Sequence, residues 1–146
     1  MKKIHIGEIF LRIEKQHKFT SSITSIYLSS TYFKDTKLLK QQYNKSVDFN
    51  IHPQNTDYKA IIIHEYGHSL GEYLQNSKNI SRLQIKKEVL KRANYKAKDV
   101  KEKLSEYATR NTNEFFAEAF SEYLDSPKPR KIAKIFGEYI DEILKN

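Results

Sequence analysis

Apolar side chains recur every three or four residues along most of the chain, which is the spacing of amphipathic helices. The most apolar stretch spans residues 57–75 and follows a turn at Pro53–Thr56, with Asp57 placed to favour a helix N-terminus. The charged stretch 34–46 is a candidate for a short helix. Helical spacing also recurs over 4–17, around Leu83–Leu90 and Val100–Leu104, over 112–124 up to Ser126–Pro127, and over 132–144.

Two segments near the N-terminus break this helical spacing. Residues 21–30 are rich in β-branched and aromatic side chains, and residues 47–53 alternate and stop at Pro53, which suits an edge strand. We therefore predict an α+β fold that is mostly helical, with a small N-terminal β-sheet. No internal repeat or linker divides the chain, so residues 1–146 are expected to form a single domain.

Composition narrows the chemistry that this domain can carry. The chain has 10 Tyr and 8 Phe, enough aromatic material to bury a core, and it has no cysteine. Disulfides and thiolate metal sites are therefore excluded, so any metal must be held by His, Asp or Glu.

The charge balance indicates which partners are electrostatically feasible. The net charge of +8 would suit nucleic acid, but the lysines are spread over 34–45, 78–103 and 128–134 without a nucleic-acid motif, so we interpret them as solvated helix faces. No apolar run reaches the length of about 18 residues that a membrane helix needs. The N-terminus alternates charged and apolar residues, unlike a secretory signal, so we expect a cytoplasmic protein with no membrane partner.

The segment His64-Glu65-Tyr66-Gly67-His68 lies in the most apolar predicted helix. Positions i and i+4 share one helix face, so both imidazoles can reach a single Zn²⁺ at about 2.0–2.1 Å. In this motif the glutamate after the first ligand is the general base toward a metal-bound water. Because three of five positions are fixed, the match alone also fits surface histidines or hydrogen-bonded core histidines.

Burial favours the metal interpretation of this motif. Glu65 directly follows three isoleucines, and burying a carboxylate and two imidazoles costs several kcal/mol unless a metal or hydrogen bonds compensate. Gly67 and Gly71 each give up roughly 1 kcal/mol inside a helix, which indicates close packing or an approaching substrate.

A zinc site of this kind needs a third protein ligand and an open fourth position. Glu114 and Glu118 stand one turn apart in the predicted helix 112–124 and are the candidates. Glu114 also fits a capping-box partner of Asn111, and Glu118 also fits a plain surface residue. From spacing, either glutamate can be the ligand while the other orients a histidine from behind.

Two groups of residues carry a resemblance to a known family. HEYGH followed by YATRNTNEFFAEAF resembles the gluzincin metallopeptidases, most closely the catalytic domain of anthrax lethal factor and its relatives. The upstream stretches ITSIYLSSTYFKD and FNIHPQNTDYKAIIIHEYGH are similar to zincin-like domains encoded by phages and mobile elements of Firmicutes, often beside minor head proteins. The similarity covers roughly residues 20–125.

The resemblance implies a zincin-like fold and a zinc-dependent endopeptidase that acts on a peptide or protein. It implies Glu114 as the third zinc ligand, Glu118 as the carboxylate behind a histidine, Glu65 as base and Tyr107 as the tyrosine that assists the transition state. Without the family, Tyr107 would be interpreted as a packed aromatic residue. The edge strand near 47–52 is expected to align an extended substrate by main-chain pairing.

Two other functions compete with the peptidase. One is a non-catalytic zinc-binding structural module of a phage particle or mobile element, against which the presence of Glu65 and Tyr107 argues, since a purely structural site needs neither. The other is a basic nucleic-acid-binding protein in which the metal motif is incidental, and salt-sensitive DNA binding without metal would indicate it.

Overall fold

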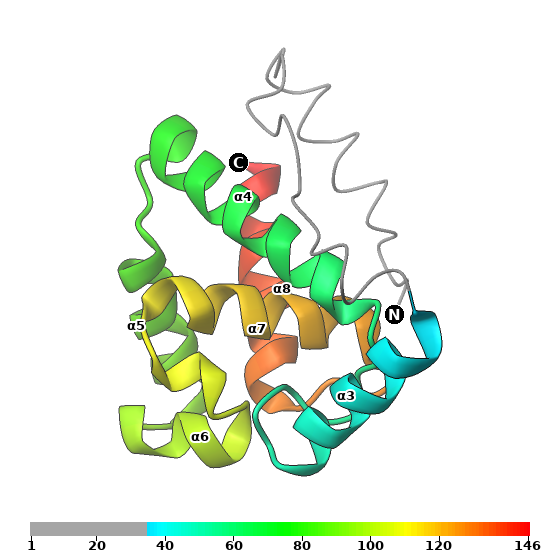
Figure 1. Ribbon diagram of the computed structural model, residues 1–146. Coiled ribbons are helices and arrows are strands. Elements are labelled where there is room, and N and C mark those ends of the chain that lie inside the picture. Colours follow the sequence, from blue (N-terminus) through cyan, green and yellow to red (C-terminus); the bar gives the residue numbers. More distant parts are fainter. Residues whose placement is uncertain (1–34) are drawn as a thin grey trace.

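The computed structural model describes residues 35–146, which form helices joined by short loops (Figure 1). No helix within these residues is long and apolar enough to cross a membrane. The α-helices are α3 (Thr36–Asp48), α4 (Ala60–Lys78), α5 (Arg82–Ala93), α6 (Val100–Lys103), α7 (Thr112–Asp125) and α8 (Lys131–Lys145), and the 3₁₀ turns are η1 (Ala97–Asp99) and η2 (Tyr107–Thr109).

The predicted α+β fold with a small sheet is wrong for residues 35–146, which contain no strand. The expected edge strand at 47–53 is the end of α3 followed by a loop. Asp35 caps α3 by accepting a hydrogen bond from the Leu38 N–H at 3.1 Å, and the helix continues to Asp48. Asn50 then takes φ 58°, a left-handed conformation that breaks extended backbone. The predicted helix 4–17 and strand 21–30 lie outside the described residues.

The loop after α3 uses its backbone groups within the protein. The carbonyls of Asn50 and Ile51 accept hydrogen bonds from the backbone N–H groups of Glu106 at 2.8 Å and Tyr107 at 3.1 Å. These are carbonyls that an edge strand would have offered to an extended substrate. The expected main-chain alignment of a substrate at 47–52 is therefore wrong, and the loop instead fixes the position of η2.

The predicted helices from residue 34 onward are present, with shifted ends. α4 begins at Ala60 rather than at 57, because the Asp57 carboxylate accepts the Lys59 N–H at 2.8 Å in a turn before the helix. The Asp57 N–H donates to the Asp125 carboxylate at 2.8 Å, which ties the start of α4 to the end of α7. α4 ends at Lys78, where Asn79 in the left-handed region terminates it.

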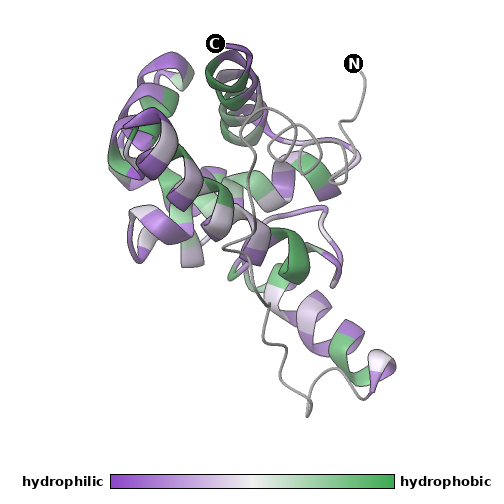
Figure 2. Cartoon of the chain, turned by 90° about the horizontal axis from the view of Figure 1, so that it is seen from above, coloured by the Kyte–Doolittle hydropathy of each residue, from purple (hydrophilic) through white to green (hydrophobic). Residues whose placement is uncertain are grey.

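α7 lies at the centre of the fold and packs against α4, α5, α8 and η2 (Figure 1). Phe115 and Phe116 of α7 are fully buried, and the ring of Phe116 meets Phe136 of α8 edge to face at 4.8 Å between centroids. Figure 2 shows hydrophobic and hydrophilic residues alternating around the helices, as expected for helices that bury one face. The core is therefore built around α7, and side chains on α7 are held rigidly.

α7 also carries two buried carboxylates one turn apart, Glu118 and Glu122. Glu122 is fully buried and accepts hydrogen bonds from Arg130 Nη2 at 2.7 Å, from its Nε at 3.0 Å and from its backbone N–H at 2.8 Å. Arg130 Nη2 also donates to the Leu104 carbonyl at 2.6 Å. This ion pair joins α7 to the start of α8 and to the loop after α6.

Candidate metal centre

His64 and His68 project from the same face of α4 toward α7, as their i, i+4 spacing requires. Their rings meet edge to face with centroids 4.8 Å apart, and the two Nε2 atoms are 3.1 Å apart. Two imidazole nitrogens so close are mutually unfavourable unless a proton or a cation lies between them. One face of α4 therefore offers two imidazole nitrogens to the same point, where a proton or a cation can lie.

Glu114, near the start of α7, supplies the other side of the site. Its Oε2 atom lies 2.9 Å from His64 Nε2 and 3.4 Å from His68 Nε2. Although it is this close, Oε2 is buried and makes no hydrogen bond of acceptable geometry within residues 35–146. A buried carboxylate oxygen without a hydrogen bond is costly, which indicates that it faces a point where a cation would lie.

The size of this triangle fits a small divalent cation. Ligand atoms about 2.0–2.1 Å from a tetrahedral zinc stand roughly 3.3–3.4 Å from one another. The three separations here are 2.9, 3.1 and 3.4 Å. Two neutral imidazoles and one carboxylate are also a donor set that zinc accepts.

Glu65 stands beside these atoms from the exposed side of α4. His64, Glu65 and His68 form a group that can hold a metal ion, because one ligand atom from each lies within 4.8 Å of the others. The Oε2 atom of Glu114 lies 2.9 and 3.4 Å from the two histidine Nε2 atoms, which is closer than 4.8 Å. We therefore regard Glu114 as the better third ligand and Glu65 as a residue beside the ion. The sequence argument that Glu65 is buried is wrong, because its side chain is exposed.

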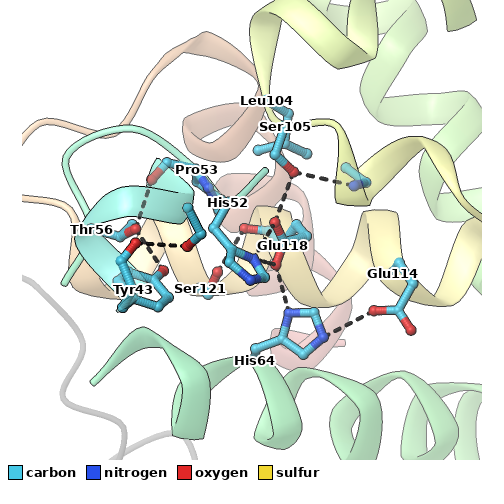
Figure 3. A network of polar contacts seen from close by, with 12 residues as sticks. Tyr43, His52, Pro53, Thr56, His64, Leu104, Ser105, Glu114, Glu118 and Ser121 are labelled. Carbon is cyan, nitrogen blue, oxygen red and sulfur yellow. Dashed lines mark hydrogen bonds and ion pairs between the residues drawn. The ribbon is translucent and has the colours of Figure 1, made fainter. Parts of the chain in front are cut away.

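Glu118 holds His64 from the side away from the triangle (Figure 3). Its carboxylate is 1% exposed, and Oε1 lies 2.7 Å from His64 Nδ1 while Oε2 accepts from the Ser105 hydroxyl at 2.7 Å. An ionised carboxylate can only accept, so His64 must carry its proton on Nδ1. The lone pair of His64 Nε2 is thereby directed toward Glu114 and His68, as metal-bound imidazoles require.

Burial and contacts within the centre together shift the pKa values of His64, His68 and Glu118. Burial alone would lower the pKa of His64, but the hydrogen bond to Glu118 and the charges of Glu118 and Glu114 outweigh it and raise that pKa. Burial alone would raise the pKa of Glu118, but hydrogen bonds from His52 and His64 hold it below its usual range. The pKa of His68 is lowered, first by burial and then by the neighbouring His64. Glu118 is thus the stable anion of the centre.

Asn111 and Glu114 form one of the two hydrogen bonds that make up a capping box. Asn111 Oδ1 accepts the Glu114 backbone N–H at 2.9 Å and caps α7. The carboxylate of Glu114 is directed to the imidazoles of α4 and not back to the backbone of Asn111. Only half of the capping box that the sequence allowed is formed, and the side chain of Glu114 is available to a metal.

Tyr107 lies in η2 at the edge of the centre. Its ring centroid is 5.8 Å from that of His64, and the guanidinium carbon of Arg110 stands 4.3 Å from the Tyr107 centroid, within cation–π range. The ring borders a pocket that opens beside the triangle. The residues that line this pocket are Tyr43, His52, Ala60, Ile61, His64, Glu65, Tyr107 and Glu118.

His52 and Ser105 belong to the centre but were not predicted from the sequence. His52 Nδ1 lies 3.2 Å from Glu118 Oε1 and 3.3 Å from Oε2, and it comes from the loop that was interpreted as a strand. The available signal was that the chain has only 5 His, of which His52 stands just before Pro53 and twelve residues ahead of His64. Ser105 gave no signal of its own, because a serine in a loop is common.

Comparison of the chain with protein-family models, with curated proteins and with solved structures gives no match. The centre is therefore interpreted from its own chemistry: two imidazoles and one carboxylate converge, a second carboxylate holds one imidazole, and an exposed carboxylate and a tyrosine border the adjoining pocket.

Proposed function

We propose that this chain is a zinc-dependent peptidase of the gluzincin type, with the metal held by His64, His68 and Glu114. The observation that carries the proposal is the triangle of ligand atoms at 2.9, 3.1 and 3.4 Å, one member of which is a buried carboxylate oxygen without a hydrogen bond. Three protein ligands leave one coordination position for a water or substrate, which is the arrangement of a catalytic and not of a structural zinc site.

The donor set favours zinc over other common cations. Calcium and magnesium prefer oxygen ligands, whereas two imidazoles suit zinc and its transition-metal neighbours. When bound, zinc supplies a Lewis acid that polarises a peptide carbonyl and makes a water molecule more acidic. Everything else in the reaction is done by side chains of this chain.

In this proposal Glu65 is the general base. Its exposed carboxylate follows His64 directly, lines the pocket and lies within the 4.8 Å group formed with His64 and His68. A carboxylate oxygen there takes the proton of the attacking water and passes it to the nitrogen of the leaving amine. Because Glu114 already supplies the third ligand atom, Glu65 is not needed for binding the metal.

In this proposal Tyr107 stabilises negative charge on the carbonyl oxygen. Its hydroxyl donates a hydrogen bond to the developing oxyanion, a contribution of about 2–4 kcal/mol for donors of this kind. Backbone hydrogen bonds from Tyr107 and Glu106 to the loop after α3 hold η2 in place, and Arg110 covers the Tyr107 ring. These contacts support the proposal, because they hold the backbone and the ring of Tyr107 without a substrate.

The pocket beside the triangle is the site for a substrate side chain. Its walls combine the rings of Tyr43, His52 and Tyr107 and the side chains of Ala60 and Ile61 with three polar groups, those of His64, Glu65 and Glu118. Such a mixed surface can receive one substrate side chain next to the scissile bond. We therefore expect cleavage preferences to be set by one side chain that enters this pocket.

Elemental analysis and cleavage of a peptide library, each with and without chelator, test the proposal. We expect one zinc per chain and cleavage that chelator abolishes and added zinc restores. Glu65→Gln is the matched control, because it preserves size and leaves the three ligands intact. It should bind zinc like the unaltered chain and cleave nothing. A folded chain that takes up no zinc would overturn the proposal, and loss of zinc from Glu65→Gln would make Glu65 a ligand.

A further inference from the structure

A third histidine, His52, shares the carboxylate that holds the metal ligand His64. Its Nδ1 lies 3.2 and 3.3 Å from the two oxygens of Glu118, while His64 Nδ1 lies 2.7 Å from Oε1 (Figure 3). Ser105 Oγ donates to Oε2 at 2.7 Å. Three donors therefore converge on a carboxylate that is 1% exposed.

A buried carboxylate depends on such donors for both its charge and its orientation. Without water, each missing donor leaves part of the charge unsolvated and lets the carboxylate rotate. If Glu118 turned away from His64, the imidazole could carry its proton on Nε2 instead of Nδ1. His64 would then offer an N–H group instead of a lone pair to the metal.

The ring of His52 is held in place by the loop and by its neighbours. It stacks on Tyr43 with centroids 5.3 Å apart and planes at 10°, and the ring of Tyr107 lies 5.5 Å away on the pocket side. The Tyr43 hydroxyl hydrogen-bonds Thr56 at 2.8 Å, and the Thr56 hydroxyl donates to the Pro53 carbonyl at 2.7 Å. Pro53, the residue after His52, is thereby connected through Thr56 to Tyr43, on which the His52 ring stacks.

We propose that His52 is a positioning residue for the metal centre: by donating from Nδ1 to Glu118, it fixes the carboxylate that holds His64 in the tautomer a metal ion requires. The inference rests on the proposed function for its metal-binding consequence. The effect of His52 on the tautomer of His64 does not depend on a metal, so it can be measured in the metal-free chain.

Two substitutions separate the hydrogen bond of His52 from its packing. His52→Phe keeps a ring against Tyr43 but removes the donor, whereas His52→Asn removes the ring and places an amide N–H near the position of Nδ1. In the metal-free full-length chain, ¹H–¹⁵N correlation spectra of the imidazoles report the tautomer of His64. Zinc affinity is measured on the same samples by competition with a chelator, and thermal melts confirm that each variant is folded.

At a pH where His64 is neutral, we expect it to be in the Nδ1–H form in the unaltered chain and in His52→Asn, and in a mixture of forms in His52→Phe. Partners of metal-bound histidines typically change affinity 10–100-fold, so zinc binding should weaken about 10-fold in His52→Phe and stay within about 3-fold in His52→Asn. An unchanged His64 tautomer in His52→Phe would overturn the inference, as would equal losses in both variants. If the unaltered chain bound no zinc, the proposed function would fail, whereas the tautomer result would still decide the role of His52.

Discussion

Gly67 of α4 and Ala117 of α7 are so close that a Cβ atom on Gly67 would lie 2.9 Å from the Ala117 Cα atom. The contact is with backbone, which cannot turn away as a side chain can. The two helices carry the candidate ligands His64 and His68 on one side and Glu114 on the other. The absence of a side chain at position 67 therefore sets the spacing of the metal centre.

Gly67→Ala is expected to push α4 away from α7 and to lower both the free energy of unfolding and the affinity for zinc. Overpacking of this kind costs about 1–3 kcal/mol of unfolding free energy, and widening the ligand triangle should lower zinc affinity about 10-fold or more. Gly71→Ala is the matched control, because the three atoms nearest to a Cβ there belong to the side chain of Arg82 and not to the backbone of α7. Denaturant melts and zinc titration of both variants test this, and equal zinc affinities would contradict it.

Glu114 and Glu118 are expected to respond differently to the same change. Glu114→Gln should remove a ligand and weaken zinc binding more than Glu118→Gln, for which a loss of about 10–100-fold is typical of an outer partner. In the metal-free chain the order reverses: Glu118→Gln should cost about 1–3 kcal/mol because the amide keeps only one of the two acceptor oxygens and sets an NH2 group against the donors of the other, whereas Glu114→Gln should cost little because Oε2 has no hydrogen bond. If zinc titration showed the larger loss of affinity for Glu118→Gln, the roles of the two glutamates would be exchanged.

Glu122→Gln is expected to destabilise the fold without touching the metal centre. Glu122 is fully buried against Arg130, so removing its charge leaves a guanidinium partly buried and unpaired, at a cost of about 3 kcal/mol. Glu142→Gln breaks the surface pair with Arg92 and should leave the melting temperature unchanged. Thermal melts with zinc titration check both variants. A stable Glu122→Gln protein would show that the Arg130 pair does not hold α8 in place.

Tyr107→Phe is expected to slow cleavage while zinc binding is unaffected. Removing one donor to an oxyanion typically lowers kcat about 10²–10³-fold, and phenylalanine keeps the ring beside His64 and Arg110. Tyr139→Phe, on α8 beneath Arg92, serves as control for loss of a tyrosine hydroxyl elsewhere. Steady-state kinetics on a cleaved library peptide give the comparison. Full activity in Tyr107→Phe would remove Tyr107 from the mechanism.

The helical spacing of α4 and α8 predicted those helices well, because each buries a continuous apolar face that leaves a clear period in the sequence. The expected strand at 47–53 failed for a local reason. Alternating apolar residues there resemble an edge strand, but the cap at Asp35 starts a helix that runs through Val47, and Asn50 then turns the backbone into the left-handed region. Such a turn depends on the contacts of the loop with η2, which no local pattern records.

The candidate site shows the same division between local and long-range information. His64 and His68 could be predicted as a pair, because their spacing of one helical turn is visible in the sequence. Spacing could not rank Glu114 and Glu118, because both stand one turn apart on the same helix, and only the packing of α7 directs one to the Nε2 atoms and the other to Nδ1. His52 lies in a separate loop, so its approach to Glu118 is a property of the tertiary fold alone.

One row of side chains along α7 has a consequence for how this helix is stabilised. Glu114, Glu118 and Glu122 follow one another at four-residue intervals. Glu114 faces the imidazoles of α4, Glu118 meets His64, His52 and Ser105, and Glu122 meets Arg130. In an isolated peptide of this segment, like charges at this interval would repel by about 0.2–0.5 kcal/mol per pair. Inside the protein, contacts from distant parts of the chain offset this repulsion, so acid should increase the helicity of the free peptide while weakening the same segment in the folded chain.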